Sequence, residues 1–146
     1  MNHSPSHILA EYLIGEGILI DPDDSGSGNW RVYIGSTPDG IHADHEVAVA
    51  VDTAPVKDGR VQGTPLFHHG VQFILRSTDY SVGYAKATEI AEDLATVSHE
   101  DVTVDDDTYT IINVTQTTGV VVMGQEPGTK RRELFSVNFL ATLREV

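Results

Sequence analysis

The alternation of apolar and polar residues predicts several β-strands in this chain of 146 residues. Three of them come early, at residues 30–35, 46–52 and 71–76. In the second, Val47, Val49 and Val51 fall on one face and small alanines on the other. The third is apolar almost throughout, so we expect it near the centre of a sheet.

A longer period predicts two helices. Residues 79–97 have an apolar face opposite a polar one, and small alanines on the apolar face would let this helix lie close to a sheet. The apolar face comprises Tyr84, Ala87, Ile90, Ala91, Leu94 and Val97. A shorter helix, residues 5–14, is expected near the N-terminus, with Ser4 as its N-cap and Pro5 at its first position.

The second half of the chain returns to β-type patterns. Strands are expected at residues 102–104, 109–115, 120–124 and 133–143, with a hairpin loop at 125–129 between the last two. The fold class predicted for residues 1–146 is therefore a single α+β domain. Its sheet should be mainly antiparallel or mixed, with an N-terminal helix and one central amphipathic helix packed on it. Residues 53–65 form a long loop, which is typical of functional or mobile segments.

Composition and charge exclude several classes. The chain has no cysteine, so disulfides and thiol catalysis are excluded. No secretory signal is evident at the N-terminus, and no apolar run approaches the roughly 18 residues of a membrane span. The 22 acidic and 9 basic residues give a net charge of −13. Binding to nucleic acid, sequence-specific or not, is not expected, because such proteins neutralise phosphates with Lys and Arg.

Candidate metal and catalytic patterns are incomplete. Residues 21–26 resemble the start of an EF-hand loop, but its twelfth position is Val32 instead of a bidentate glutamate, which favours a plain Asp-rich turn. The histidine pairs His42/His45 and His68/His69 flank predicted loops, and we interpret them as surface residues with no metal. No residues can be assigned acid, base and nucleophile roles, so we predict neither an enzyme nor a cofactor.

The basic run Lys130-Arg131-Arg132 contains a third of all Lys and Arg residues in the chain. One interpretation is a charged hairpin rim that discourages strand pairing. The other is a contact with an acidic neighbour, such as a second copy of the same chain. The candidate interface residues are Lys130, Arg131, Arg132 and, in the long loop, Lys57 and Arg60.

The order of these elements resembles the tail terminator proteins of long-tailed bacteriophages, also called minor capsid or tail completion proteins. An N-terminal helix precedes the strand at residues 30–35, and residues 70–76 lead into a helix with the pattern Tyr84, Ala87, Ile90, Ala91 and Leu94. A Val-rich strand ending in Met123-Gly124 and a charged turn come before the closing Phe135-Ser-Val-Asn-Phe139. This closing strand is the most specific part of the resemblance.

The resemblance implies a structural virion protein. Such proteins form a hexameric ring that caps the tail tube, stops its polymerisation and offers a surface to the head–tail connector protein. The expected partners are therefore further copies of the chain, the tail tube protein and the connector, with assembly in the host cytoplasm. Two alternatives stay open: another head–tail junction or tail tube protein, and a non-viral module that binds metal through its histidine pairs.

Overall fold

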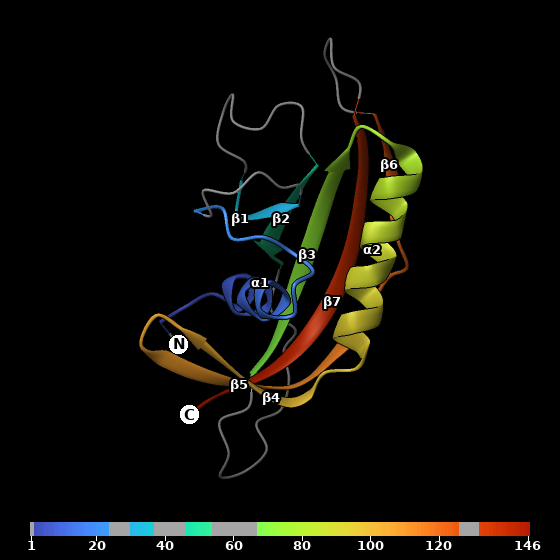
Figure 1. Cartoon of the computed structure of the whole chain (residues 1–146). Helices are drawn as coiled ribbons and strands as arrows, with labels where there is room; N and C mark the ends of the chain where they lie inside the picture. The colour runs from blue at the N-terminus through green and yellow to red at the C-terminus, as the bar shows by residue number, and fades with distance from the viewer. Residues whose placement is uncertain (1, 24–29, 37–45, 54–66, 126–131) are drawn as a thin grey trace.

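A computed structural model describes residues 2–23, 30–36, 46–53, 67–125 and 132–146 (Figure 1). The described chain forms one mixed sheet with two helices, which confirms the predicted α+β class. The strands are β1 (Arg31–Ile34), β2 (Val47–Asp52), β3 (Phe67–Ser77), β4 (Ser98–Val104), β5 (Asp107–Gln116), β6 (Val121–Gln125) and β7 (Glu133–Glu145).

Helix α1 (Pro5–Gly15) begins as the sequence predicts. Ser4 is the N-cap, its hydroxyl accepts a hydrogen bond from the backbone N–H of His7, and Pro5 occupies the first turn. Ser6 fixes the helix to β2, because its N–H and hydroxyl donate to the two carboxylate oxygens of Asp52 at 2.9 and 2.8 Å. The apolar side chains of Ile8, Leu9 and Leu13 are fully buried.

Helix α2 (Tyr80–Ala95) is capped by Asp79, whose carboxylate accepts from the N–H of Val82 at 3.2 Å. Its buried face contains the predicted Ala87, Ile90, Ala91 and Leu94. Tyr84 was also expected on this face, but it is 45% exposed, and Gly83 is buried in its place. The helix therefore faces the sheet along a line that includes the glycine and leaves the tyrosine outside.

The main path of the sheet is β1-β2-β3-β7-β5-β4. Only β1 and β2 are parallel among the described pairs; the others are antiparallel. The whole length of β3 pairs with residues 133–143 of the central strand β7. The other side of β7 is shared, because β5 pairs with residues 139–145 and β6 with residues 133–136.

Both helices cover the same face of the sheet. On β3 and β7 the odd-numbered residues Phe73, Leu75, Val137 and Phe139 are buried, as expected from the two-residue period of a strand. On β2 the alanine face is the one fully buried in the core, which suits the close contact between α1 and this strand. No helix in the described part of the chain is long and apolar enough to span a membrane.

Candidate functional site

Strand β6 is exposed along its whole length. Val121, Val122 and Met123 keep 45%, 42% and 51% of their surface accessible, and no residue of the strand is charged. Among the described residues β6 pairs only with β7, so its outer edge carries unpaired backbone N–H and C=O groups. Proteins usually protect such edges with charged residues, proline or a bulge. Here a register irregularity between Val122 and Gly124 is the only such device within the strand.

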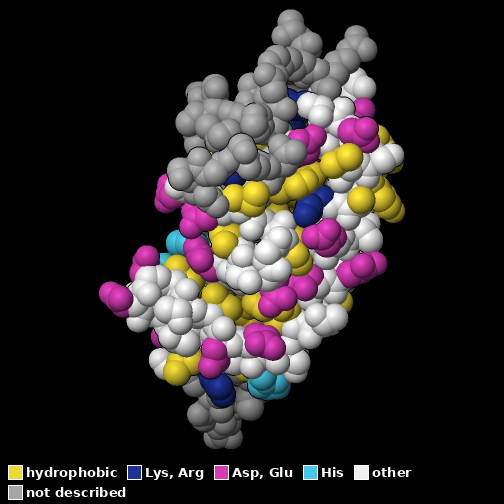
Figure 2. Space-filling view, in the orientation of Figure 1, with side chains coloured by type: hydrophobic (Ala, Val, Ile, Leu, Met, Phe, Trp, Pro, Cys, Tyr) yellow, Lys and Arg dark blue, Asp and Glu magenta, His cyan; other side chains and the backbone are white. Residues whose placement is uncertain are grey.

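Two exposed tyrosines extend this apolar surface onto α2. The rings of Tyr80 and Tyr84 stack with centroids 6.3 Å apart, and both meet the buried ring of Phe135 edge to face, at 5.3 and 6.4 Å. Val122 is the cross-strand partner of Phe135, so its side chain lies on the same face of the sheet as these rings. Figure 2 shows hydrophobic side chains exposed at the upper right margin, where Figure 1 places β6 and the start of α2.

We name this the β6 surface: Tyr80, Tyr84, Val121, Val122 and Met123. A groove continues from it along α2. Its lining residues, one of them charged, are Tyr84, Thr88, Ala91, Glu92 and Ala95 of the helix together with Gln116 and Val120. The sequence predicted the strand but not its exposure, because a continuous apolar run is equally typical of a buried strand. An exposed uncharged edge of this kind is suited to contact with another protein surface.

The predicted basic interface is only partly described. Lys57, Arg60, Lys130 and Arg131 lie outside the described residues. Arg132 is described and is 9% exposed, so it is not part of a solvated charged rim. A buried guanidinium needs partners, which gives Arg132 a role within the fold.

Carboxylates gather beside the end of α1, where the helix faces β4. A groove between the end of α1 and β4 is lined by Glu11, Glu16, Glu100 and Asp101, with Tyr12 among them. Burial and then the nearby charges of Asp93, Glu16 and Glu100 raise the pKa of Tyr12 to about 12. Acidic side chains are widespread on this face of the molecule (Figure 2), in keeping with the net charge.

Asp93 contributes to this excess of negative charge at an unfavourable place. It lies in the last turn of α2, and its Oδ2 is buried without a hydrogen-bond partner in the described part of the chain. Burial, followed by the charges of Glu16 and Glu89, raises its pKa. A carboxylate near the C-terminal end of a helix is also opposed by the helix dipole.

We therefore expect Asp93→Asn to raise the free energy of unfolding at pH 7 by about 0.3–1 kcal/mol. Because the pKa of Asp93 is higher in the folded than in the unfolded state, its protonated carboxyl stabilises the fold. This stabilisation is complete below the unfolded-state pKa and is lost as pH rises through the folded-state pKa. The gain should thus vanish near pH 3, where Asp93 is protonated in both states. Urea unfolding at both pH values measures it, with Glu92→Gln on the exposed side of the same helix as control. Because Glu92 lies in the same last turn, an equal gain from Glu92→Gln would assign the effect to net charge and the helix dipole instead of to the burial of Asp93.

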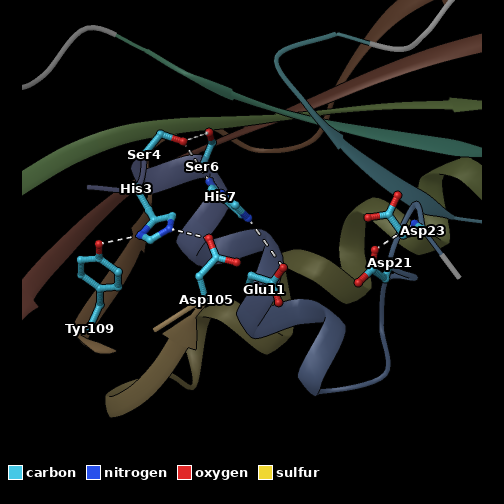
Figure 3. Close-up of polar contacts among 9 residues, drawn as sticks. All are labelled: His3, Ser4, Ser6, His7, Glu11, Asp21, Asp23, Asp105 and Tyr109. Atoms are coloured by element: carbon cyan, nitrogen blue, oxygen red, sulfur yellow. Dashed lines mark hydrogen bonds and ion pairs between the residues drawn. The ribbon is translucent and has the colours of Figure 1, made fainter. Parts of the chain in front are cut away.

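The segment before α1 is anchored by a long-range contact of His3. His3 Nδ1 lies 2.8 Å from the hydroxyl of Tyr109, and its Nε2 lies 3.0 Å from Asp105 Oδ2 (Figure 3). Asp107 Oδ2 is 3.6 Å from Nδ1. These contacts tie the N-terminal segment to the turn between β4 and β5 and to the start of β5, more than 100 residues away along the chain. No local sequence pattern reports a pairing over this separation.

The candidate metal ligands that the structure describes do not assemble into a metal site. Within the described residues, no group of three or more His, Asp or Glu side chains is arranged to hold a metal ion. His68 and His69 belong to β3 and are half-buried, so their assignment to a loop surface was wrong. His68 Nδ1 lies 2.9 Å from Thr142 Oγ1, and burial lowers the pKa of His69. His42 and His45 lie outside the described residues.

The Asp-rich segment after α1 contains a local turn. Asp21 Oδ1 accepts from the N–H of Asp23 at 2.9 Å, a hydrogen bond typical of an Asx turn (Figure 3). Val32, at the position of the missing glutamate, is 1% exposed in β1, so the expected strand follows where an EF-hand would have a helix. Residues 24–29 lie outside the described part.

Comparison with known proteins gives the family. No curated protein matches the chain. The family model described as bacteriophage tail terminator protein matches residues 12–144, which include the last turn of α1, the whole of α2, strands β1 to β6 and all but the last residue of β7. This span covers the β6 surface and, apart from Glu11, the acidic groove, and it agrees with the resemblance found in the sequence. The chain belongs to the bacteriophage tail terminator protein family.

Proposed function

We propose that this structural protein of the phage tail caps the tail tube as a ring of identical subunits, six in number, and so stops tube polymerisation. The ring also presents the tail-side surface to which the head–tail connector protein joins, in an assembly formed in the host cytoplasm. The observation that carries the proposal is the β6 surface, an exposed and uncharged strand edge on a member of this family. A closed ring covers such an edge in every subunit, whereas an isolated chain leaves it open to aggregation.

Physical requirements of this role agree with the chain's composition. A ring needs two different surfaces on each subunit, one for each neighbour, and it needs no catalytic group. A net charge of −13 repels a polyanion, which suits a channel through which DNA passes without binding. Lys130 and Arg131 are retained as candidate contacts to acidic side chains of a neighbouring subunit. Arg132 is left out of this set because it is buried.

The proposal is tested with the tail tube protein of the same phage, polymerised alone and with this chain. We expect tubes that stop growing and carry a ring at one end in negative-stain images. A Lys130→Glu, Arg131→Glu variant should cap less often, and higher salt should weaken the wild-type ring in the same direction. Tube growth unaffected by the wild-type protein would contradict the proposal. Open-ended tubes made by this chain alone would assign it to the tube subunits instead.

A further inference from the structure

We propose that the ring is held together by strand pairing between subunits, in which β6 of one copy lies along β4 of the next. This inference rests on the proposed function, since it names the two surfaces that meet in the ring. The first step is that β6 requires a cover. Three consecutive apolar residues and an unpaired backbone edge are exposed on it, and none of its residues carries a charge that would discourage association.

The second step identifies the edge that receives it. Besides β6, the sheet ends at β1 and at β4. The outer side of β1 is already engaged by Ile20, whose N–H donates to the carbonyl of Trp30 at 3.0 Å and whose carbonyl accepts from Val32 at 3.1 Å. β4 pairs only with β5 within the described chain. Its outer edge therefore has no strand partner among the described residues, and it borders the groove that separates β4 from α1.

Charge distinguishes the possible pairings. β4 carries Glu100 and Asp101, both exposed, and the turn after it carries Asp105 and Asp106, also exposed. Two β4 edges placed together would bring these carboxylates beside one another, which is unfavourable. The uncharged β6 adds no such repulsion. The connection that follows it in the sequence, residues 126–131, contains Lys130 and Arg131 against a single acid, Glu126, so its net charge is opposite to that of the β4 edge.

The positions of the two strands favour a ring. β6 pairs with β7 at residues 133–136, whereas β5, which carries β4 on its far side, pairs with residues 139–145. The two open edges therefore lie toward opposite ends of the long central strand (Figure 1). One subunit can offer β6 to one neighbour and β4 to the other, which is the heterologous contact that a closed ring needs. Pairing of two β6 edges would instead close a two-fold dimer.

Because the chain contains no cysteine, engineered cysteines test this contact directly. Double variants combine Val121→Cys, Val122→Cys or Met123→Cys in β6 with Glu100→Cys, Asp101→Cys or Thr103→Cys in β4. Opposed residues of paired strands have Cα atoms about 4.5–5.5 Å apart, within the range a disulfide bridges. After oxidation of rings formed at high concentration or on tube ends, at least one combination should give a ladder of covalent oligomers on a non-reducing gel. Mixing its two single variants should stop the ladder at the dimer.

A matched control replaces the β4 cysteine with Glu89→Cys, an exposed position on α2. We expect several-fold less cross-linking from this control than from the best β6–β4 combination. Rings that form while no combination exceeds the control would overturn the strand pairing and leave the proposed function standing. Dimers from Val122→Cys alone, in the yield of the best double variant, would also overturn it, since they would place two β6 edges together. If the wild-type protein formed neither rings nor capped tubes, both the proposed function and this contact would be contradicted.

Discussion

Replacing Leu94 with alanine is expected to lower the free energy of unfolding by about 2–5 kcal/mol, the range for truncating a fully buried leucine. Leu94 is 0% exposed on the face of α2 that packs against β7, β5 and β3. Removal of its side chain loses the transfer free energy of the deleted carbons and leaves a cavity that the surrounding strands cannot fill, because each is held in register by its neighbours.

Urea unfolding followed by circular dichroism measures this loss. Val82→Ala is the matched control, because Val82 lies on the same helix but is 45% exposed, and its replacement should change stability by less than about 0.5 kcal/mol. Equal effects of the two substitutions would show that Leu94 does not face the sheet. Assembly provides a second readout: Leu94→Ala should cap tubes normally at temperatures where it remains folded, since the β6 surface does not include it.

The sequence was sufficient to predict both helices and most strands because their signals are local. Ser4 and Asp79 are N-caps with a defined hydrogen bond, and the apolar positions of α2 repeat at the helical period. The extent of β3 was underestimated, at residues 71–76 instead of Phe67–Ser77. Its first residues include His68 and His69, which are polar but are held in the sheet by pairing with Thr142 and Ala141 of β7. That pairing is set by a strand some 70 residues later in the chain.

The features that matter for the proposed interface could not be predicted from local sequence patterns. The run Val121-Val-Met123 has the composition of a buried strand, and its exposure follows from its position at the edge of the sheet beside β7. Arg132 was grouped with Lys130 and Arg131 because the three are adjacent, yet Arg132 is buried immediately before β7. The parallel pairing of β1 with β2 likewise depends on the order of strands in the sheet, which apolar alternation does not encode.

Gly83, and not the predicted Tyr84, lies on the buried face of α2 for a steric reason. A glycine at this position lets the first turns of the helix approach β3 and β7 so closely that the ring of Phe135 and the Cβ of Ser77 fill the space of a side chain. Gly83, Ala87 and Ala91 then follow one another at four-residue intervals along the contact line. Tyr84, one residue on, is directed out of the contact and stacks on Tyr80 at the β6 surface.

Gly83→Ala is accordingly expected to destabilise the protein by about 1–3 kcal/mol through overpacking, although alanine is the better helix former by about 1 kcal/mol. The added Cβ would overlap the Phe135 ring and lie 2.9 Å from Ser77 Cβ. Phe135 is fully buried and is in contact with both tyrosine rings, so it cannot move aside without disturbing them. Urea unfolding measures the loss, and near-ultraviolet circular dichroism should report the shifted aromatic rings.

Two further variants separate a steric clash from a general effect of the substitution. Gly15→Ala, at the end of α1, places its Cβ in open space and should be neutral or slightly stabilising. Phe135→Leu removes the ring edge that the new methyl group meets. The double variant Gly83→Ala, Phe135→Leu should therefore lose less free energy of unfolding than the sum of the losses of the two single variants. Fully additive losses would mean that the methyl group and the ring do not meet. A Gly83→Ala protein as stable as wild type would mean that α2 lies farther from β7 than the structure places it, and the orientation of Tyr80 and Tyr84 on the β6 surface would then have to be reassigned.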